Sequence, residues 1–518
     1  MIWLGAVAKS AGGRRATLWM AVPVLSGLLA HWRVLASDFR RDDFLHFYDI
    51  ANDGVASFLF SPYGGHFYLL RNLVFAGAYE LFGLAAAPYF LLALAVHALN
   101  AALLFVVLRR EAGSNAVAAA LASVWSASPA HTQTLEWFSA IGHPLAATTL
   151  LLALCAIGPA GDDDRASGGN RVPSGADRQA SLARWTAALV LLFAGSTCFG
   201  VGVGIAMVFP AFAWLWTPPT GRGRAAALSA VLLVAVPALY LASPMLSAAF
   251  DTADRIGDVA PPFSSIALLS IAALFAQLLL YGAGALAFLS SLLLAFDQAL
   301  RLPLSLLALG GLVAAALAVR GAARRRVVAW LLLALGGYAV IALGRAWLYF
   351  DAQRDFWAAA AEPRYHYTGQ LALCGAAAAL FGGLAAERRL TPRLRAALLF
   401  AAAALCALNV RTGLRHELLP TGRDELARVQ RRIAAAVLAQ PPGAVVCLPN
   451  EPFENVDFWV IGLRGERFPG TAAVYVLWND PELRRRRVLF VEPDPRVLDY
   501  VRRRRGRVRE VLVAEGRC

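Results

Sequence analysis

The chain has 518 residues, of which 59% are hydrophobic and only 16% are charged, and its mean hydropathy is +0.57. A soluble globular domain rarely carries so large an apolar share, so the composition excludes an ordinary soluble protein and indicates a membrane protein. The net charge of +14 does not indicate nucleic-acid binding. The basic residues mostly gather in short segments between apolar runs, which is the positive-inside pattern of membrane proteins.

Apolar runs of about 20 residues, long enough to cross a bilayer about 30 Å thick, recur along most of the chain. The first is predicted over residues 16–36, and the next strong one over 85–108. We predict an all-α polytopic bundle of about eleven to thirteen transmembrane helices, because lipid forces each span to satisfy its own backbone hydrogen bonds. The stretch 263–320 is almost continuously apolar and leaves one or three crossings open.

The positions of the basic residues predict the orientation. Lys9 and Arg14 precede the first span, so the N-terminus is expected in the cytoplasm. The polar loop at 37–64 then faces outward, and the polar insert at 159–183 forms a flexible cytoplasmic linker. Residues 1–411 are thus predicted to form the membrane domain.

The last hundred residues are expected outside the membrane. Counting the crossings places residues 412–518 on the outer face, as a small extracytoplasmic domain. A helical pattern at 422–440 is followed by β-like runs at 444–448, 473–477 and 487–491. This alternation predicts a small α/β fold.

The outer loop carries the first candidate site. Asp42 and Asp43 are adjacent, and Asn52 and Asp53 follow ten residues later. Paired carboxylates directly after a first span could act as a general base or hold a divalent cation. The alternative is a solvated loop in which neighbouring arginines neutralise the acids.

A second polar cluster is the hairpin at 129–143, also assigned to the outer face. His131 and Glu136 could contact a substrate there, and Trp137 suits a membrane interface. The alternative is that these residues cap helices and anchor the hairpin at the interface.

A third cluster contains Arg364 and Tyr365 in the last outer loop, with Arg345 just inside the preceding span. An arginine within lipid is costly, so Arg345 is expected to face a polar cavity or to extend to the interface. Because guanidinium groups match phosphate oxygens, these arginines are candidates for binding a lipid phosphate. The alternative for Arg364 is an ion pair with acids of its own loop.

In their order along the chain, these features resemble the GT-C superfamily of polytopic glycosyltransferases, and within it the protein O-mannosyltransferase-like branch. The chain is similar to relatives of the transmembrane-and-tetratricopeptide-repeat O-mannosyltransferases, but it lacks the repeats. The matching motifs are Asp42-Asp43 with Asn52-Asp53, Ser128-Pro129-Ala130-His131, and Arg364-Tyr365-His366-Tyr367. The sequence departs from the family pattern at Ser128 and Gln133, and either His66 or Arg71 stands where the family has an arginine.

The resemblance implies a hexosyltransferase-type enzyme at the outer face of a bacterial inner membrane. It would move a sugar from a polyprenyl-phosphate-linked donor to an acceptor hydroxyl on a protein, lipid or glycan. Asp42 and Asp43 would be catalytic, and no cofactor is implied beyond a divalent cation that the acids could hold. The donor phosphate and lipid would contact Arg345, Arg364, Tyr365 and Tyr367, and further substrate contacts would come from Asn52, Asp53, His66, His131, Glu136 and His366.

Two other functions fit many helices with polar outer loops. One is a transporter or flippase of lipid-linked saccharides, and the other is a non-catalytic membrane scaffold. Transporters place coupling sites near the middle of the membrane, whereas the ionisable residues here concentrate at one face. The sequence therefore favours the enzyme.

Overall fold

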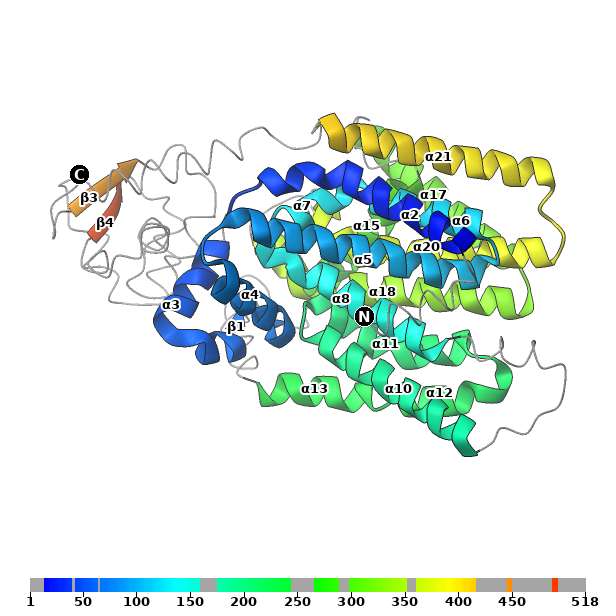
Figure 1. The fold of residues 1–518 in the computed structure, drawn as a ribbon, viewed down its shortest axis with the longest axis horizontal. Helices are drawn as coiled ribbons and strands as arrows, with labels where there is room; N and C mark the ends of the chain where they lie inside the picture. The colour runs from blue at the N-terminus through cyan, green and yellow to red at the C-terminus, as the bar shows by residue number, and fades with distance from the viewer. Residues whose placement is uncertain are drawn as a thin grey trace.

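Helices dominate the part of the chain that the computed structural model describes, which is residues 14–39, 42–63, 66–158, 175–243, 265–287, 298–351, 360–415, 445–449 and 487–491 (Figure 1). The helices up to the linker are α2 (Arg14–His31), η1 (Trp32–Ala36), α3 (Asp42–Phe60), α4 (Leu69–Phe82), α5 (Ala86–Ala112), α6 (Asn115–Ser126), η2 (Pro129–His131), α7 (Thr132–Leu135), η3 (Phe138–Ile141) and α8 (Gly142–Ile157). The later helices are α10 (Gly175–Ser196), α11 (Gly200–Trp216), η4 (Pro219–Gly221), α12 (Arg222–Ser229), α13 (Leu232–Ala242), α15 (Ser265–Ala287), α17 (Gln298–Ala318), α18 (Gly321–Asp351), η5 (Pro363–His366), α20 (Tyr367–Ala386) and α21 (Pro392–Arg415). The strands are β1 (Pro62–Tyr63), β2 (His66–Phe67), β3 (Val445–Pro449) and β4 (Arg487–Val491).

The lengths of the helices confirm a polytopic membrane fold. In the described residues, eight helical segments are long and apolar enough to cross a bilayer. Four shorter apolar helices of 10–17 residues lie among them. The protein is therefore a multi-pass membrane protein, and its backbone polar groups are satisfied within helices, as lipid requires. The number of eleven to thirteen transmembrane helices stays a prediction.

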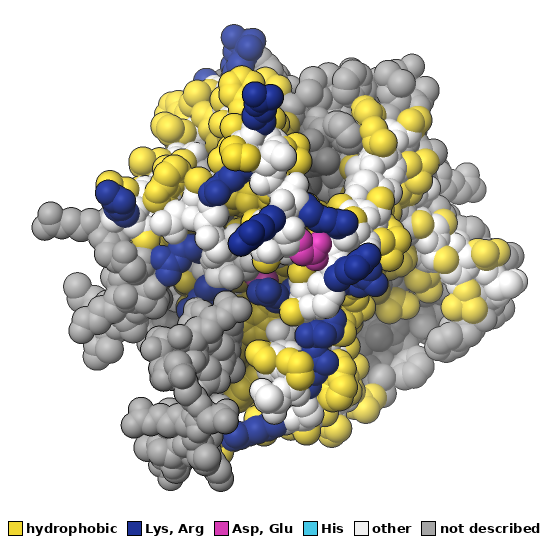
Figure 2. Space-filling model, turned by 90° about the vertical axis from the view of Figure 1, so that its right-hand side faces the viewer, with side chains coloured by type: hydrophobic (Ala, Val, Ile, Leu, Met, Phe, Trp, Pro, Cys, Tyr) yellow, Lys and Arg dark blue, Asp and Glu magenta, His cyan; other side chains and the backbone are white. Residues whose placement is uncertain are grey.

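The charge at one end of the bundle agrees with the positive-inside pattern. Figure 2 shows this arginine-rich end, where basic side chains gather with few acids between them. It includes the last turn of α5, the start of α12, the first turn of α18 and the turn between α20 and α21. The arginines in these segments are Arg109, Arg110, Arg222, Arg224, Arg324, Arg325, Arg326, Arg388 and Arg389.

The predicted outer loop at 37–64 is instead mostly helical. Within α3 the chain kinks at Gly54, whose φ of 81° is readily adopted only by glycine. Phe47 and Phe58 of this helix are buried in a second, smaller core that also contains Phe75 and Phe138. Burial of these aromatic side chains explains why the segment folds as a helix against the bundle and does not remain a solvated loop.

The predicted linker at 159–183 is shorter than expected. Its final nine residues already belong to α10, which begins at Gly175. The remainder, 159–174, lies outside the described residues.

The apolar stretch 263–320 holds two described helices. Gly284 in α15 lies against Ser305 in α17, so the pair runs antiparallel. The ring of Tyr281 lies 4.9 Å from that of His366, measured between centroids, and His366 is at the end of α20 opposite the arginine-rich end. Residues 288–297 of this stretch lie outside the described part, so its number of crossings stays a prediction. The preceding residues, 244–264, lie outside the described part.

Two of the predicted C-terminal strands are present. β3 pairs with β4 in parallel, with Val445 opposite Arg487. They correspond to the β-like runs expected at 444–448 and 487–491. A parallel pair needs a crossover connection, as α/β folds provide. The helix expected at 422–440 and the strand at 473–477 lie outside the described residues, so the α/β domain stays a prediction.

Helices α11 and α18 pack through glycines. A Cβ atom added at Gly204 would overlap the carbonyl oxygen of Gly336 in α18. On the α10 side, one added at Gly202 would overlap the carbonyl oxygen of Gly195. Small residues allow close backbone approach, which is how helices associate in lipid without a hydrophobic driving force.

This packing predicts that Gly204→Ala destabilises the bundle, because the added methyl has no space at the α11–α18 contact. Overpacking of this kind costs about 1–3 kcal/mol. We expect a lower thermal midpoint in detergent, measured by tryptophan fluorescence. Gly310→Ala is the matched control, since no atom lies within 4 Å of the added Cβ. Equal midpoints for the two variants would contradict the prediction.

Candidate functional site

The polar segments opposite the arginine-rich end come from four parts of the chain. The hairpin η2–α7–η3 connects α6 to α8, and η5 leads into α20. The hairpin packs against η5, while β2 and the start of α11 approach from the other side. These short elements enclose the candidate site.

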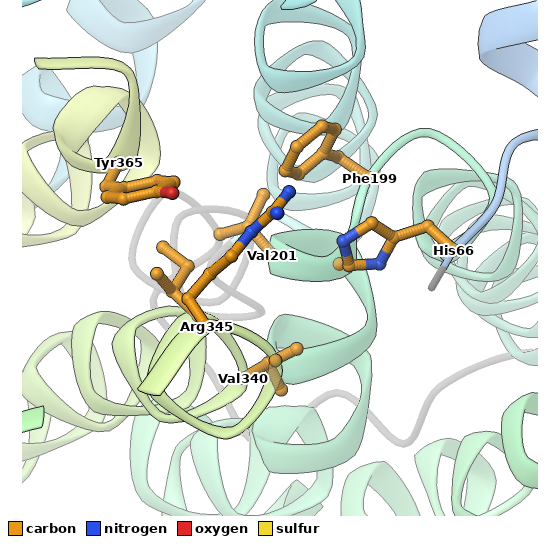
Figure 3. Close-up of a pocket in the computed structure, with 9 residues that line it drawn as sticks. His66, Phe199, Val201, Val340, Arg345 and Tyr365 are labelled. Atoms are coloured by element: carbon orange, nitrogen blue, oxygen red, sulfur yellow. The ribbon is translucent and has the colours of Figure 1, made fainter. Parts of the chain in front are cut away.

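A small pocket, with room for about one water molecule, lies between β2, α11, α18 and η5. Its polar lining consists of His66, Arg345 and Tyr365, and Phe199 and Gly200 complete the wall beside them. Figure 3 shows the Arg345 side chain leaving α18 and extending between Tyr365 and Phe199, with the His66 imidazole on the far side. Three residues that the sequence assigned to substrate binding therefore share one pocket.

The charge in this pocket is positive. Arg345 is the charged residue among those that line it, and no carboxylate does so. The pKa of His66 is lowered to about 3, mainly by burial and to a smaller extent by the charges of Arg345 and Arg71. The imidazole is therefore neutral at physiological pH. Helix α11 also begins here at Gly200 without a side-chain cap, and its first N–H groups carry partial positive charge. The arrangement suits one anionic group.

Gly200 brings the start of α11 close to His66. A Cβ atom at this position would lie 2.6 Å from Cε1 of the imidazole, which is closer than real contacts allow. His66 also contacts the Phe199 ring, with centroids 5.1 Å apart. His143 lies behind that ring at a centroid distance of 3.9 Å.

Arg364 lies next to the pocket. Its guanidinium carbon is 5.1 Å from the centre of the Trp137 ring and 5.2 Å from that of Tyr365. Glu362 pairs with it at 3.9 Å, as the alternative interpretation of this arginine expected. Gln133 joins the two segments, because its amide nitrogen donates to Glu362 at 3.2 Å and its oxygen accepts from the backbone N–H of Arg364 at 3.3 Å.

Asp43 is fully buried and anchors α3. Its Oδ1 accepts hydrogen bonds from the backbone N–H and the hydroxyl of Ser139, at 2.7 and 2.5 Å. The carbonyl of Ser139 accepts in turn from the buried Arg71 at 3.2 Å. Arg71 also donates to Nε2 of His46. This cluster adjoins the pocket, since Arg71 lies over the ring of Tyr68 and the Tyr68 ring contacts His66.

Two other predicted residues face the bundle interior. The hydroxyl of Tyr367 donates to Nδ1 of His97 at 2.8 Å, and the Asn100 amide donates to it at 3.2 Å. His366 donates from Nε2 to the carbonyl of Ala360 at 2.6 Å and accepts from the Tyr338 hydroxyl at 3.0 Å. Neither residue lines the pocket.

His131 and Glu136 are also buried. The His131 ring contacts Trp125 and Tyr367, with centroids 4.8 and 4.6 Å away, and burial is the main cause that lowers its pKa well below the usual value. The side chains of Asp42, Asn52 and Asp53 lie outside the described part of the structure. Among the described residues no group of three or more His, Cys, Asp or Glu could hold a metal ion.

Three contributors were not predicted from the sequence: Ser139, Gln133 and the Phe199–Gly200 turn. Gln133 was noticed only as a departure from a family pattern. The sequence contains several glycines near residue 200, but glycine spacing does not reveal which side chain approaches. Nothing in the sequence around Ser139 indicated that it bonds to Asp43.

Comparisons with known proteins support the fold. No protein-family model and no curated protein matches the chain. The crystal structure of ArnT from Cupriavidus metallidurans bound to undecaprenyl phosphate is similar, with a TM-score of 0.53 and 15% identity over 96% of this chain and 88% of that chain. The likeness confirms an all-α polytopic membrane fold. Membership of the GT-C superfamily stays a prediction. The O-mannosyltransferase-like branch stays a prediction.

The low pKa of His66 predicts a pH dependence of stability. The folded pKa is about 3, against about 6.5 for an unfolded histidine. Between these values the unfolded chain binds a proton that the folded chain does not, so stability falls as the pH drops below about 6.5. We expect His66→Gln to lose thermal stability less steeply than wild type from about pH 7 to about pH 4. Above about pH 7.5 the two curves should run parallel, and parallel curves at acidic pH would contradict the prediction.

Proposed function

We propose that the protein is a membrane glycosyltransferase that moves a sugar from a polyprenyl-phosphate-linked donor to an acceptor hydroxyl at the outer face of a bacterial inner membrane. The observation that carries this proposal is the pocket with Arg345, neutral His66 and the start of α11. It combines a guanidinium and helix N–H groups where a lipid phosphate would lie. The similar fold of ArnT, whose structure contains undecaprenyl phosphate, supports the same donor class.

Arg345 would act on the leaving group. Negative charge develops on the donor phosphate as its bond to the sugar breaks, and preorganised positive groups stabilise that charge. Tyr365 could donate a hydrogen bond from the same wall. Arg364 would reach the phosphate from beside Tyr365, and its stacking on Trp137 restricts its position.

We assign different roles to the two adjacent acids. Asp43 is closed off from solvent and accepts two hydrogen bonds from Ser139, so we propose that it positions α3. Asp42, the preceding residue, is the better candidate for the general base that activates the acceptor hydroxyl. Asn52, Asp53, His131 and Glu136 remain proposed substrate contacts, and a divalent cation at the acids remains open to test.

Tyr367 and His366 fit an indirect role in this proposal. Their hydrogen bonds join α20 to α5 and to α18, so they would hold η5, and with it Arg364 and Tyr365, against the pocket. Residues 412–518 would lie on the same outer face as the site.

The test uses purified protein in proteoliposomes, with undecaprenyl phosphate for binding and undecaprenyl-phosphate-linked hexoses for transfer. We expect Arg345→Gln to weaken binding and to reduce transfer or hydrolysis by about 10²-fold or more, since the charge at the phosphate is lost. Asp42→Asn should retain lipid binding while turnover falls by about 10²- to 10⁴-fold.

Arg33→Gln is the control, because Arg33 is an exposed arginine at the same end of the bundle as the pocket. It should bind and turn over like wild type. Binding of undecaprenyl phosphate that is unchanged in Arg345→Gln would overturn the assignment of the pocket. Normal binding without turnover of any hexose donor by wild type would favour a transporter.

A further inference from the structure

A second cluster of arginines lies at the arginine-rich end, far from the pocket. Arg325, in the first turn of α18, interacts electrostatically with Arg222 at the start of α12 and with its neighbour Arg326. Arg326 has an acidic partner, the buried Glu111, at 3.6 Å. Arg222 and Arg325 have no ion pair within the described residues, so two cations lie close together without a counter-charge.

Hydrogen-bond donors on both arginines lack acceptors. Nε of Arg222 donates to the carbonyl of Thr217 at 3.2 Å. Its Nη2 atom and the Nε atom of Arg325 are shielded from solvent and have no hydrogen-bond partner in the described part of the chain. Both side chains are only partly buried, so their guanidinium groups can be approached from the surroundings. Guanidinium groups with unpaired donors match phosphate best.

An apolar groove begins beside Arg222. It runs between the C-terminal half of α11 and the chain from α12 to Ala230, and it is shallow and widely open to the surroundings. Ala226 lies one helical turn after Arg222 and thus on the same face of α12. Alanine side chains leave the groove hollow, and Trp214 is 48% exposed in its wall. Its lining residues are Pro210, Ala211, Trp214, Leu215, Ala226, Ala227 and Ala230.

We propose that Arg222 and Arg325 bind the phosphate of an anionic phospholipid in the leaflet at the arginine-rich end, with one acyl chain lying in the groove between α11 and α12. A soluble phosphate would satisfy the arginines but would leave the adjoining groove empty. The continuity of cationic and apolar surfaces matches a phospholipid, and Trp214 has the amphipathic ring typical of an interface. The site is independent of the proposed enzymatic activity and lies in the opposite leaflet.

The test measures binding of dioleoyl phosphatidylglycerol and dioleoyl phosphatidylcholine to the full-length protein by native mass spectrometry. We expect a preference for phosphatidylglycerol in the wild type. Each basic residue near a membrane surface contributes about fivefold to such binding, so Arg222→Gln and Arg325→Gln should each reduce the preference about fivefold, and the double variant about 25-fold.

Arg224→Gln is matched in charge and lies two residues from Arg222 on an exposed part of the same helix. It should keep the wild-type preference. If it weakens binding as much as Arg222→Gln, the attraction is diffuse electrostatics and the proposed site is wrong. Equal binding of the two lipids by wild type would also overturn it.

The groove is tested without changing the charge. Ala227→Phe fills the space between α11 and α12, so phosphatidylglycerol binding should weaken while the melting temperature without added lipid is retained. Competition by soluble glycerol phosphate provides the second measurement. If it displaces the lipid at equal concentration, the acyl chain contributes nothing and the groove assignment fails.

Discussion

A lipid environment offers no hydrogen-bond partners, and the arrangement of this protein depends on that constraint. Backbone groups pair within helices, and ionisable side chains lie mainly at the two ends of the bundle. Those that remain inside are connected to one another. His97 donates to the carbonyl of Ser126 and accepts from Tyr367, both at 2.8 Å, and the amide of Asn100 bonds the same hydroxyl. Such a network joins α5, α6 and α20 and so fixes the floor beneath the hairpin that carries His131.

The sequence predicted the location of a residue where the chemistry of its own side chain determines that location. Long apolar runs predicted the helices, and the cost of a charge in lipid predicted that Arg345 either faces a polar cavity or extends to the interface. The structure shows the first of these. The sequence was uninformative where the position of a residue depends on a contact with a residue far away in the sequence. Nothing local shows that Phe47 packs on Phe75, so α3 was taken for a solvated loop. Ser139 shows the same limit, since its role arises only because α3 brings Asp43 to it across 96 residues of chain.

Residues that form one motif in the sequence can lie in different parts of the structure. Neighbours two apart on a helix point to nearly opposite sides, so the Arg-Tyr-His-Tyr motif cannot deliver all its side chains to one ligand. Tyr365 lines the pocket, while Tyr367 reaches His97 inside the bundle. His366 bonds to α18 through Tyr338. The resemblance singled out this segment as one unit, and the turn from η5 into α20 separates the residue that lines the pocket from those inside the bundle.

The single charge in the pocket bears on how a lipid phosphate could be released after transfer. A sugar-linked phosphodiester carries one negative charge, whereas the phosphate monoester that remains gains further charge near neutral pH. Each cation added to Arg345 and the neighbouring Arg364 would strengthen binding of this product relative to the donor and would slow its release. The neutral His66 adds no such charge, and the N–H groups of α11 can stabilise the charge that develops during transfer. In the proposed reaction, the low pKa of His66 keeps the imidazole neutral, and so it adds no further cation that would favour the product.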